Sequence, residues 1–221
     1  MKPSDFNKNK LFKVSHFEGV PNFIGRGCLK NKYIFMKNKT ILLIGANNIF
    51  AHNLIKTLLL EGAFVVSILE KNLSQKFIDH DNFTFIECSS MNYDDLVSSI
   101  EDIPSIDYFI NFLEFAKFES FLETDNRSIV SLIQRNLIRT ISAMPVILEK
   151  INPEGKIINV YFKEEEYVSK AINSFWHSFL DNLQDDYPNL HFAKFSLSDF
   201  DDPDLFLELI NSFKTNISLS L

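Results

Sequence analysis

The sequence predicts an α/β fold in which a parallel sheet is covered by helices on both faces. Short apolar runs, too short for buried helices, alternate along the chain with longer segments whose apolar residues recur at helical spacing. Strand, helix and strand in regular alternation require right-handed crossovers, which build a doubly wound, Rossmann-like sheet. Ligands of such sheets bind beyond the carboxyl ends of the strands, and this is where a site is expected.

Each expected strand is a short, mainly apolar run, and these runs are residues 40–44, 63–69, 83–88, 108–112, 156–162 and 190–197. The expected helices are residues 49–61, a poorly defined one near 74–79, 93–100, 125–150, 165–185 and one from 203 onward. Gly62 is a typical helix stop and ends the first helix.

The 221 residues, 46% of them hydrophobic, are enough for one domain with a full core. Residues 1–36 lack clear periodicity and contain three of the six glycines, so they are interpreted as an extension before a single domain at 37–221. The extension holds seven basic residues and two acids, whereas the rest holds fifteen basic residues and twenty-seven acids. The basic extension either folds back on this acidic body or contacts an anion. An acidic body disfavours nucleic acid as a partner.

The remaining composition argues against several other classes of protein. Cys28 and Cys88 cannot build a disulfide framework, and a reducing compartment is the simpler interpretation. No apolar run approaches the length of a membrane span, and no secretory signal precedes the domain. The five histidines show no metal-ligand spacing, so no metal site is expected. We therefore expect a cytoplasmic protein without a membrane partner.

Four segments resemble, in order and spacing, the motifs of the short-chain dehydrogenase/reductase family. Residues 41–51 (ILLIGANNIFA) resemble the nucleotide-binding turn T-G-x-x-x-G-x-G, and residues 106–112 (IDYFINF) resemble the strand that ends in N-N-A-G. Residues 155–160 (GKIINV) resemble the strand before the catalytic serine, and Ser169-Lys170-Ala171 resembles the end of Y-x-x-x-K. The resemblance covers about residues 38–200 and implies a ketoacyl-reductase-like oxidoreductase with NAD(P) as cofactor.

The cofactor motifs are incomplete. The second and third glycines fall on Ile49 and Ala51, and the N-N-A-G segment continues after its asparagine with Phe112 and Leu113. A β-branched Ile49 would extend toward the space of the pyrophosphate. The candidate cofactor-binding residues that the resemblance leaves are Gly45, Asn47, Asn48, Glu70 and Asn111. For Glu70, beside Lys71, a surface charge is the preferred interpretation.

The catalytic motif is also incomplete. The serine position falls on Phe162 and the tyrosine position on Glu166, with Tyr167 one place away. Lys170 and Asn136 match the family's lysine and asparagine and are the candidate catalytic remnants. In the family this lysine lowers the pKa of the tyrosine, and the asparagine supports a proton relay. Without an acid to activate, these two residues do not make a catalyst. The simpler interpretation is inherited scaffold, with Lys170 as a surface charge and Asn136 as a buried polar group or kink.

These departures favour a non-catalytic Rossmann protein that needs no cofactor and acts as a partner subunit or scaffold of a reductase-type assembly. The alternative is an NAD(P)-dependent carbonyl oxidoreductase with atypical catalytic residues. A third hypothesis is a regulator that senses the dinucleotide without chemistry.

The expected partner is a second copy or another protein of the same family, bound through the helices at about 125–150 and 165–185. Both helices are apolar over more than one face, which a sheet-covering helix does not need. On the second helix one stripe is formed by Val168, Ala171, Ile172, Phe175, Phe179 and Leu183, whereas Trp176 and Leu180 point elsewhere. Alternatively, the extension lies over these helices and the protein is monomeric.

Overall fold

The structure, a computed structural model, describes residues 36–70, 78–88, 93–113, 125–161, 167–196 and 206–207. All of them belong to one of the two units into which the chain divides, residues 33–221. The expected extension, apart from Met36, lies outside the described residues, and so do Phe162, Glu166 and most of the last expected helix. The boundary at residue 36 therefore stays a prediction.

Within the described residues, six strands form one sheet, and every neighbouring pair is parallel. The strands are β1 (Thr40–Ile44), β2 (Phe64–Glu70), β3 (Phe83–Cys88), β4 (Ile106–Phe112), β5 (Ile151–Tyr161) and β6 (His191–Ser196). Their order is β3-β2-β1-β4-β5-β6. The first three strands are added toward one edge of the sheet and the last three toward the other, so the strand order reverses between β1 and β4. The predicted doubly wound, Rossmann-like sheet is confirmed.

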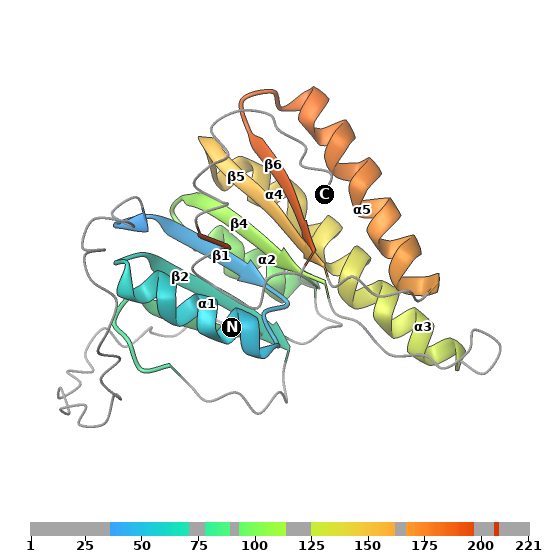
Figure 1. Ribbon diagram of the computed structural model, residues 1–221, viewed down its shortest axis with the longest axis horizontal. Helices are drawn as coiled ribbons and strands as arrows, with labels where there is room; N and C mark the ends of the chain where they lie inside the picture. Colours follow the sequence, from blue (N-terminus) through green and yellow to red (C-terminus); the bar gives the residue numbers. More distant parts are fainter. Residues whose placement is uncertain are drawn as a thin grey trace, which may run out of the picture. The chain divides into compact units, whose positions relative to one another are not determined.

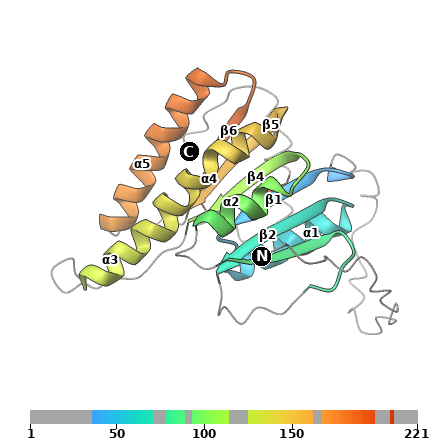
Figure 2. The same ribbon diagram turned by 180° about the vertical axis from the view of Figure 1, so that it is seen from behind.

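Helices pack on both faces of this sheet (Figures 1 and 2). They are α1 (Ile49–Leu60), α2 (Tyr93–Glu101), α3 (Asn126–Ile133), the π-helix η2 (Gln134–Ile138), α4 (Arg139–Lys150) and α5 (Tyr167–Asp186). One apolar cluster joins α1 to its face of the sheet and includes Phe206 and Leu207. A second cluster joins α2, α3, α4 and α5 to the opposite face. Each strand therefore contributes alternate residues to two cores.

Three local details differ from the sequence-based expectation. The strand expected to begin at residue 156 begins at Ile151, because an irregularity in its pairing with β4 lets the chain pass Pro153 and Gly155 without ending the strand. Of the helix expected near 74–79, only residues 78 and 79 are described, and neither is helical. The single long helix expected at 125–150 contains a π-helical stretch in its middle.

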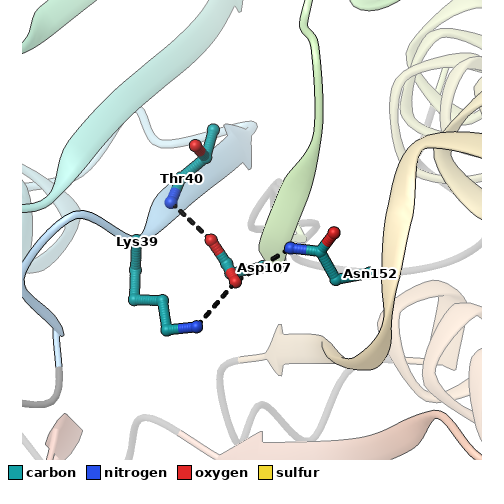
Figure 3. Close-up of polar contacts among 4 residues, drawn as sticks. All are labelled: Lys39, Thr40, Asp107 and Asn152. Atoms are coloured by element: carbon teal, nitrogen blue, oxygen red, sulfur yellow. Dashed lines mark hydrogen bonds and ion pairs between the residues drawn. The ribbon is translucent and has the colours of Figure 1, made fainter.

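A carboxylate at the amino-terminal edge of the sheet connects its three central strands (Figure 3). Asp107 of β4 accepts hydrogen bonds from the Lys39 Nζ at 2.8 Å, the Thr40 backbone N–H at 2.8 Å and the Asn152 Nδ2 at 2.9 Å. Burial alone would raise the pKa of Asp107, but the hydrogen bonds from Lys39, Thr40 and Asn152 outweigh it and lower the pKa below 3.8. The ionised carboxylate therefore stabilises the fold.

Replacing Asp107 by asparagine is expected to lower the free energy of unfolding by about 2 kcal/mol near neutral pH, because three hydrogen bonds to a charged acceptor are weakened. A lowered pKa means that this contribution is present above 3.8 and is lost as the pH falls through the folded-state value. The gap between the two proteins should therefore close in acid. Urea unfolding, followed by circular dichroism, measures it. Lys39→Met, which removes only a half-exposed ion pair, should cost less; an equal cost would contradict the assignment.

Candidate nucleotide crevice and relay site

The turn after β1 is built on Gly45, which has a φ of +76°. A Cβ atom at this position would lie 2.2 Å from the backbone oxygen of Phe112 at the end of β4. The turn therefore touches β4, the neighbouring strand, at the point where the strand order reverses. Only glycine fits there. This is where a doubly wound sheet binds its ligands.

The two asparagines that follow are part of the turn, as the sequence predicts. The Asn47 backbone N–H donates to the Gly45 oxygen at 2.7 Å. Asn48 is the N-cap of α1, and its Oδ1 accepts a hydrogen bond from the Ala51 backbone N–H at 2.8 Å. Free N–H groups in the first turn of a helix are the groups that bind phosphate in nucleotide-binding folds. In this chain the Asn48 side chain already takes up one of them.

Ile49 is the first residue of α1, and 79% of its surface is exposed. An apolar, β-branched side chain therefore stands in solvent at the helix terminus where the family resemblance calls for glycine. Ala51, at the position of the third glycine, is fully buried and packs in the α1 core. Of the two replacements, only Ile49 adds an exposed side chain at the start of α1, where the pyrophosphate of a dinucleotide would bind.

The end of β4 is a packed core rather than an open wall. Phe112 is buried in the α1 core, with its ring 6.3 Å from that of Phe50, whereas Leu113 is buried in the core on the opposite face. Asn111 is also buried, and its Nδ2 donates to the Asn159 Oδ1 at 2.7 Å. Its Oδ1 accepts from the Thr140 hydroxyl at 3.2 Å. Its amide therefore holds β4, β5 and α4 together.

Glu70 is the last residue of β2 and pairs with Cys88 of β3. Its side chain lies outside the described part of the chain, so its role stays a prediction. The resemblance places the family's ribose-binding acid on Leu69, the residue before Glu70, and Leu69 is buried.

Asn136 lies in the middle of the π-helix η2 and is buried. Its Nδ2 donates to the Leu132 oxygen at 3.0 Å, and its backbone oxygen accepts from the Trp176 indole Nε1 at 3.0 Å. Asn136 is thus a buried polar group, and it lies within a π-helical stretch of the helix. The indole N–H of Trp176 thus joins α5 to the π-helical turn.

Lys170 lies in the first turn of α5 and is exposed, as expected of a surface charge. Tyr167 begins the same helix with 75% of its surface exposed, whereas Ser169 is fully buried. Because residues 162–166 are outside the described part, the structure does not place Phe162 or Glu166.

Two features at this edge carry no signal in the sequence. Arg139, the first residue of α4, is buried, and its Nη2 would lie 3.5 Å from a Cβ at Gly45, so a guanidinium lies against the β1 turn. The ring of Tyr161, the last residue of β5, packs edge-on against that of His177 at 5.6 Å. Burial raises the pKa of the Tyr161 phenol. Both contacts depend on residues far apart in the chain.

Comparison with known proteins identifies this arrangement by its fold. The chain superposes on BdcA, solved in complex with NADPH, with a TM-score of 0.61 and 16% identity over 72% of this chain and 69% of that one. It superposes on a short-chain dehydrogenase from Leptospira borgpetersenii with bound NAD⁺, with a TM-score of 0.64 and 15% identity over 83% and 77%. For a variant of a Serratia marcescens short-chain dehydrogenase/reductase, the TM-score is 0.62 and the identity 14% over 82% and 91%.

The fold is that of the short-chain dehydrogenases/reductases. No family model matches the sequence, and no curated protein is similar to it. Identities of 14–16% establish the fold and carry over no residue's role.

Two further observations concern the described residues alone. Among them, no three His, Cys, Asp or Glu side chains gather as a metal site requires. None of their helices combines the length and apolar character needed to cross a membrane. Cys88 is buried and forms no disulfide within this part of the chain, and Cys28 lies outside it.

Proposed function

We propose that this protein uses a short-chain dehydrogenase/reductase fold for assembly rather than catalysis, as a partner subunit or scaffold that binds a second copy or a relative of the same fold. The observation that carries the proposal is the engagement of Asn136. Its side-chain amide is bonded within its own helix, and its backbone oxygen is bonded to the indole of Trp176. The asparagine of the family's relay motif therefore serves the packing of α5 against η2.

The side chains that could donate a proton to a carbonyl are poorly suited to it, which supports a protein without carbonyl-reductase activity. A reductase of this fold needs a phenol that gives up its proton readily, with a lysine to lower its pKa. The sequence has glutamate at position 166, and the phenol that ends β5, Tyr161, has its pKa raised by burial. Tyr167 stands in solvent at the start of α5. Lys170 is thus a remnant and a surface charge in this proposal.

The residues at the carboxyl ends of β1 and β4 support the proposal that the protein holds no resident dinucleotide. The Asn48 side chain caps the helix that would receive the pyrophosphate, and Ile49 stands exposed beside it. Asn111 is enclosed in a network with Asn159 and Thr140. Gly45, Asn47 and Glu70 complete the candidate set, which would serve NAD(P) if the chain takes any cofactor.

The outer faces of two helices supply the surface for assembly. On α3, η2 and α4 the buried side is formed by Leu132, Ala143, Met144 and Ile147. Leu137, Ile141, Val146 and Leu148 are partly buried against the same core. The apolar side chains that are half-buried or exposed outside it are Ile129, Val130, Ile133 and Ile138. Val130 and Ile138 keep 52% and 43% of their surface exposed. Apolar exposure of this kind on a sheet-covering helix favours a protein interface.

The second helix shows the same two-sided character. Ile172, Trp176 and Leu180 face the core, so Ile172 belongs with the tryptophan and not with the stripe in which the sequence pattern placed it. Phe175, 37% exposed, stacks on Phe179 with ring centroids 5.7 Å apart. Phe179 is itself partly buried against the core, so Phe175 gives α5 an aromatic outer face, and aromatic side chains are common anchors at interfaces.

We expect static light scattering to give the full chain a mass at least twice its 25.6 kDa. Phe175→Glu should shift this mass to that of the monomer, because a charge would be buried in the interface. Leu60→Glu is the matched control: Leu60 is 85% exposed on α1, in the layer on the other face of the sheet, and its substitution should leave the mass unchanged.

A monomeric full chain at high concentration would overturn self-association through this surface. A variant beginning at Met36 then separates two causes. If this shorter chain associates, the extension covers the helices in the full chain; if it too is monomeric and soluble, the surface is not an interface between copies.

A further inference from the structure

A histidine is enclosed between α5 and the last two strands, at a position that neither the crevice nor the relay motif uses. The ring of His177 lies edge-on against that of Tyr161 of β5, and its Nε2 is buried without a hydrogen-bond partner among the described residues. An imidazolium would carry a proton on both ring nitrogens. The added N–H on Nε2 would then lack an acceptor, which costs free energy in a buried place.

A fixed positive charge beside the ring adds to this cost. Lys194 of β6 reaches across to α5, where its Nζ donates to the backbone oxygen of His177 at 3.1 Å and to the Asp181 Oδ1 at 2.6 Å. Its ammonium is therefore held next to the residue that would become charged. Burial lowers the pKa of His177, Lys194 lowers it further, and Asp181 opposes both.

The charged and titratable groups that face the imidazole can be named for each described element packed against it. Tyr161 faces it from β5, Lys194 from β6, and Asp181 from the next turn of α5. The histidine of β6, His191, points to the opposite face, because Ala193, two residues on, packs in the α1 core.

We infer that His177 is an acid-sensitive latch: when it takes up a proton, α5 separates from β5 and β6, and the aromatic outer face of α5 is lost as a docking surface. The latch rests on the observed contacts alone, and only the loss of docking rests on the proposed function. Since the folded-state pKa lies below 6.5, the stabilisation by neutral His177 is complete above 6.5 and is lost as the pH falls below it.

The chain carries its own reporter for this test. Trp176 is the only tryptophan, precedes His177 on α5, and is 1% exposed. Separation of α5 would bring the indole into water and shift its emission to longer wavelength. Emission spectra and urea midpoints of the dilute full chain are compared at about pH 7.5 and about pH 5.5, on the two sides of the ordinary imidazole pKa.

The wild type should show red-shifted emission and a lower urea midpoint at the acid pH. His177→Phe keeps an aromatic ring against Tyr161 but cannot titrate, so both changes should be reduced or absent. His191→Phe, on the neighbouring strand and the opposite face, should behave like the wild type. Equal responses of the wild type and His177→Phe, or an unchanged wild-type emission, would overturn the latch.

Light scattering at the same two pH values separates this inference from the proposed function. Association at the higher pH that is lost in acid by the wild type but kept by His177→Phe supports the whole inference. A chain that is monomeric at both pH values, with the fluorescence response intact, overturns the proposed function and with it the loss of docking, and leaves the latch itself supported.

Discussion

Replacing Gly45 by alanine is expected to lower the free energy of unfolding by about 4 kcal/mol or more, which is among the largest effects of a single added methyl group. Two costs combine at this position. The φ of +76° is unfavourable for any residue with a Cβ, and the new atom would lie 2.2 Å from the backbone oxygen of Phe112. A backbone carbonyl in a parallel sheet cannot move aside without breaking the pairing of β4.

Gly62 offers a matched control for this prediction. Its φ of +79° is almost the same, but a Cβ there would meet nothing closer than the Lys37 side chain at 3.5 Å. Gly62→Ala should therefore lose only the conformational term, about 1–2 kcal/mol. Urea unfolding of the two variants measures the difference directly. Similar losses in both would mean that the turn after β1 does not touch β4.

Truncation of Trp176 is expected to have the second large effect. Trp176→Ala removes a side chain that is 1% exposed and should lower the free energy of unfolding by about 3–5 kcal/mol. It also leaves the backbone oxygen of Asn136 without the indole N–H that binds it. The milder Trp176→Phe variant keeps most of the packing and loses this hydrogen bond, at about 1–3 kcal/mol.

The neighbouring residue gives the comparison for α5. Phe175→Ala truncates an aromatic ring that is 37% exposed and should cost well under half as much stability. Unfolding is followed by circular dichroism, because the Trp176 variants lack the fluorescent probe. If Phe175→Ala costs as much as Trp176→Ala, the core face of α5 has been assigned to the wrong side chains.

The fold could be predicted from the sequence because the patterns that indicate its strands and helices lie within short segments. Apolar runs such as Thr40–Ile44 are too short for helices, and Gly62 ends α1, so periodicity and a helix stop are enough to order the elements. The part that periodicity could not decide is the beginning of β5. There the strand continues back to Ile151 through a pairing irregularity that has no signature in apolar spacing.

The candidate site could be predicted only in part from the sequence, because its contacts join residues that are far apart in the chain. The sequence indicated that Asn136 is buried or kinked, and that Lys170 is a surface charge. It could not indicate that Trp176 donates to the Asn136 oxygen across 40 residues, or that Arg139 lies against Gly45. Grouping Ile172 with Phe175 followed helical spacing correctly but could not decide which side of α5 faces the sheet.

Ile49 is the position at which the crevice can be opened without disturbing the core. Phe112 is unsuitable, since it is buried against Phe50 and a polar replacement would destabilise the α1 core. Ile49→Gly removes an exposed side chain, and Leu60→Gly at the other end of the same helix is its control. If bulk at the helix terminus is what excludes the dinucleotide, weak NADPH binding should appear in the first variant and not in the second.

The most direct test of non-catalytic assembly is calorimetric titration of the full chain with NADPH and then NADH. We expect no saturable heat with either, because the start of α1 is capped by Asn48 and flanked by Ile49, and the amide of Asn111 is engaged in the core. A dissociation constant of about 1 µM, equivalent to about 8 kcal/mol of binding free energy, would contradict it and favour a working oxidoreductase or a dinucleotide sensor.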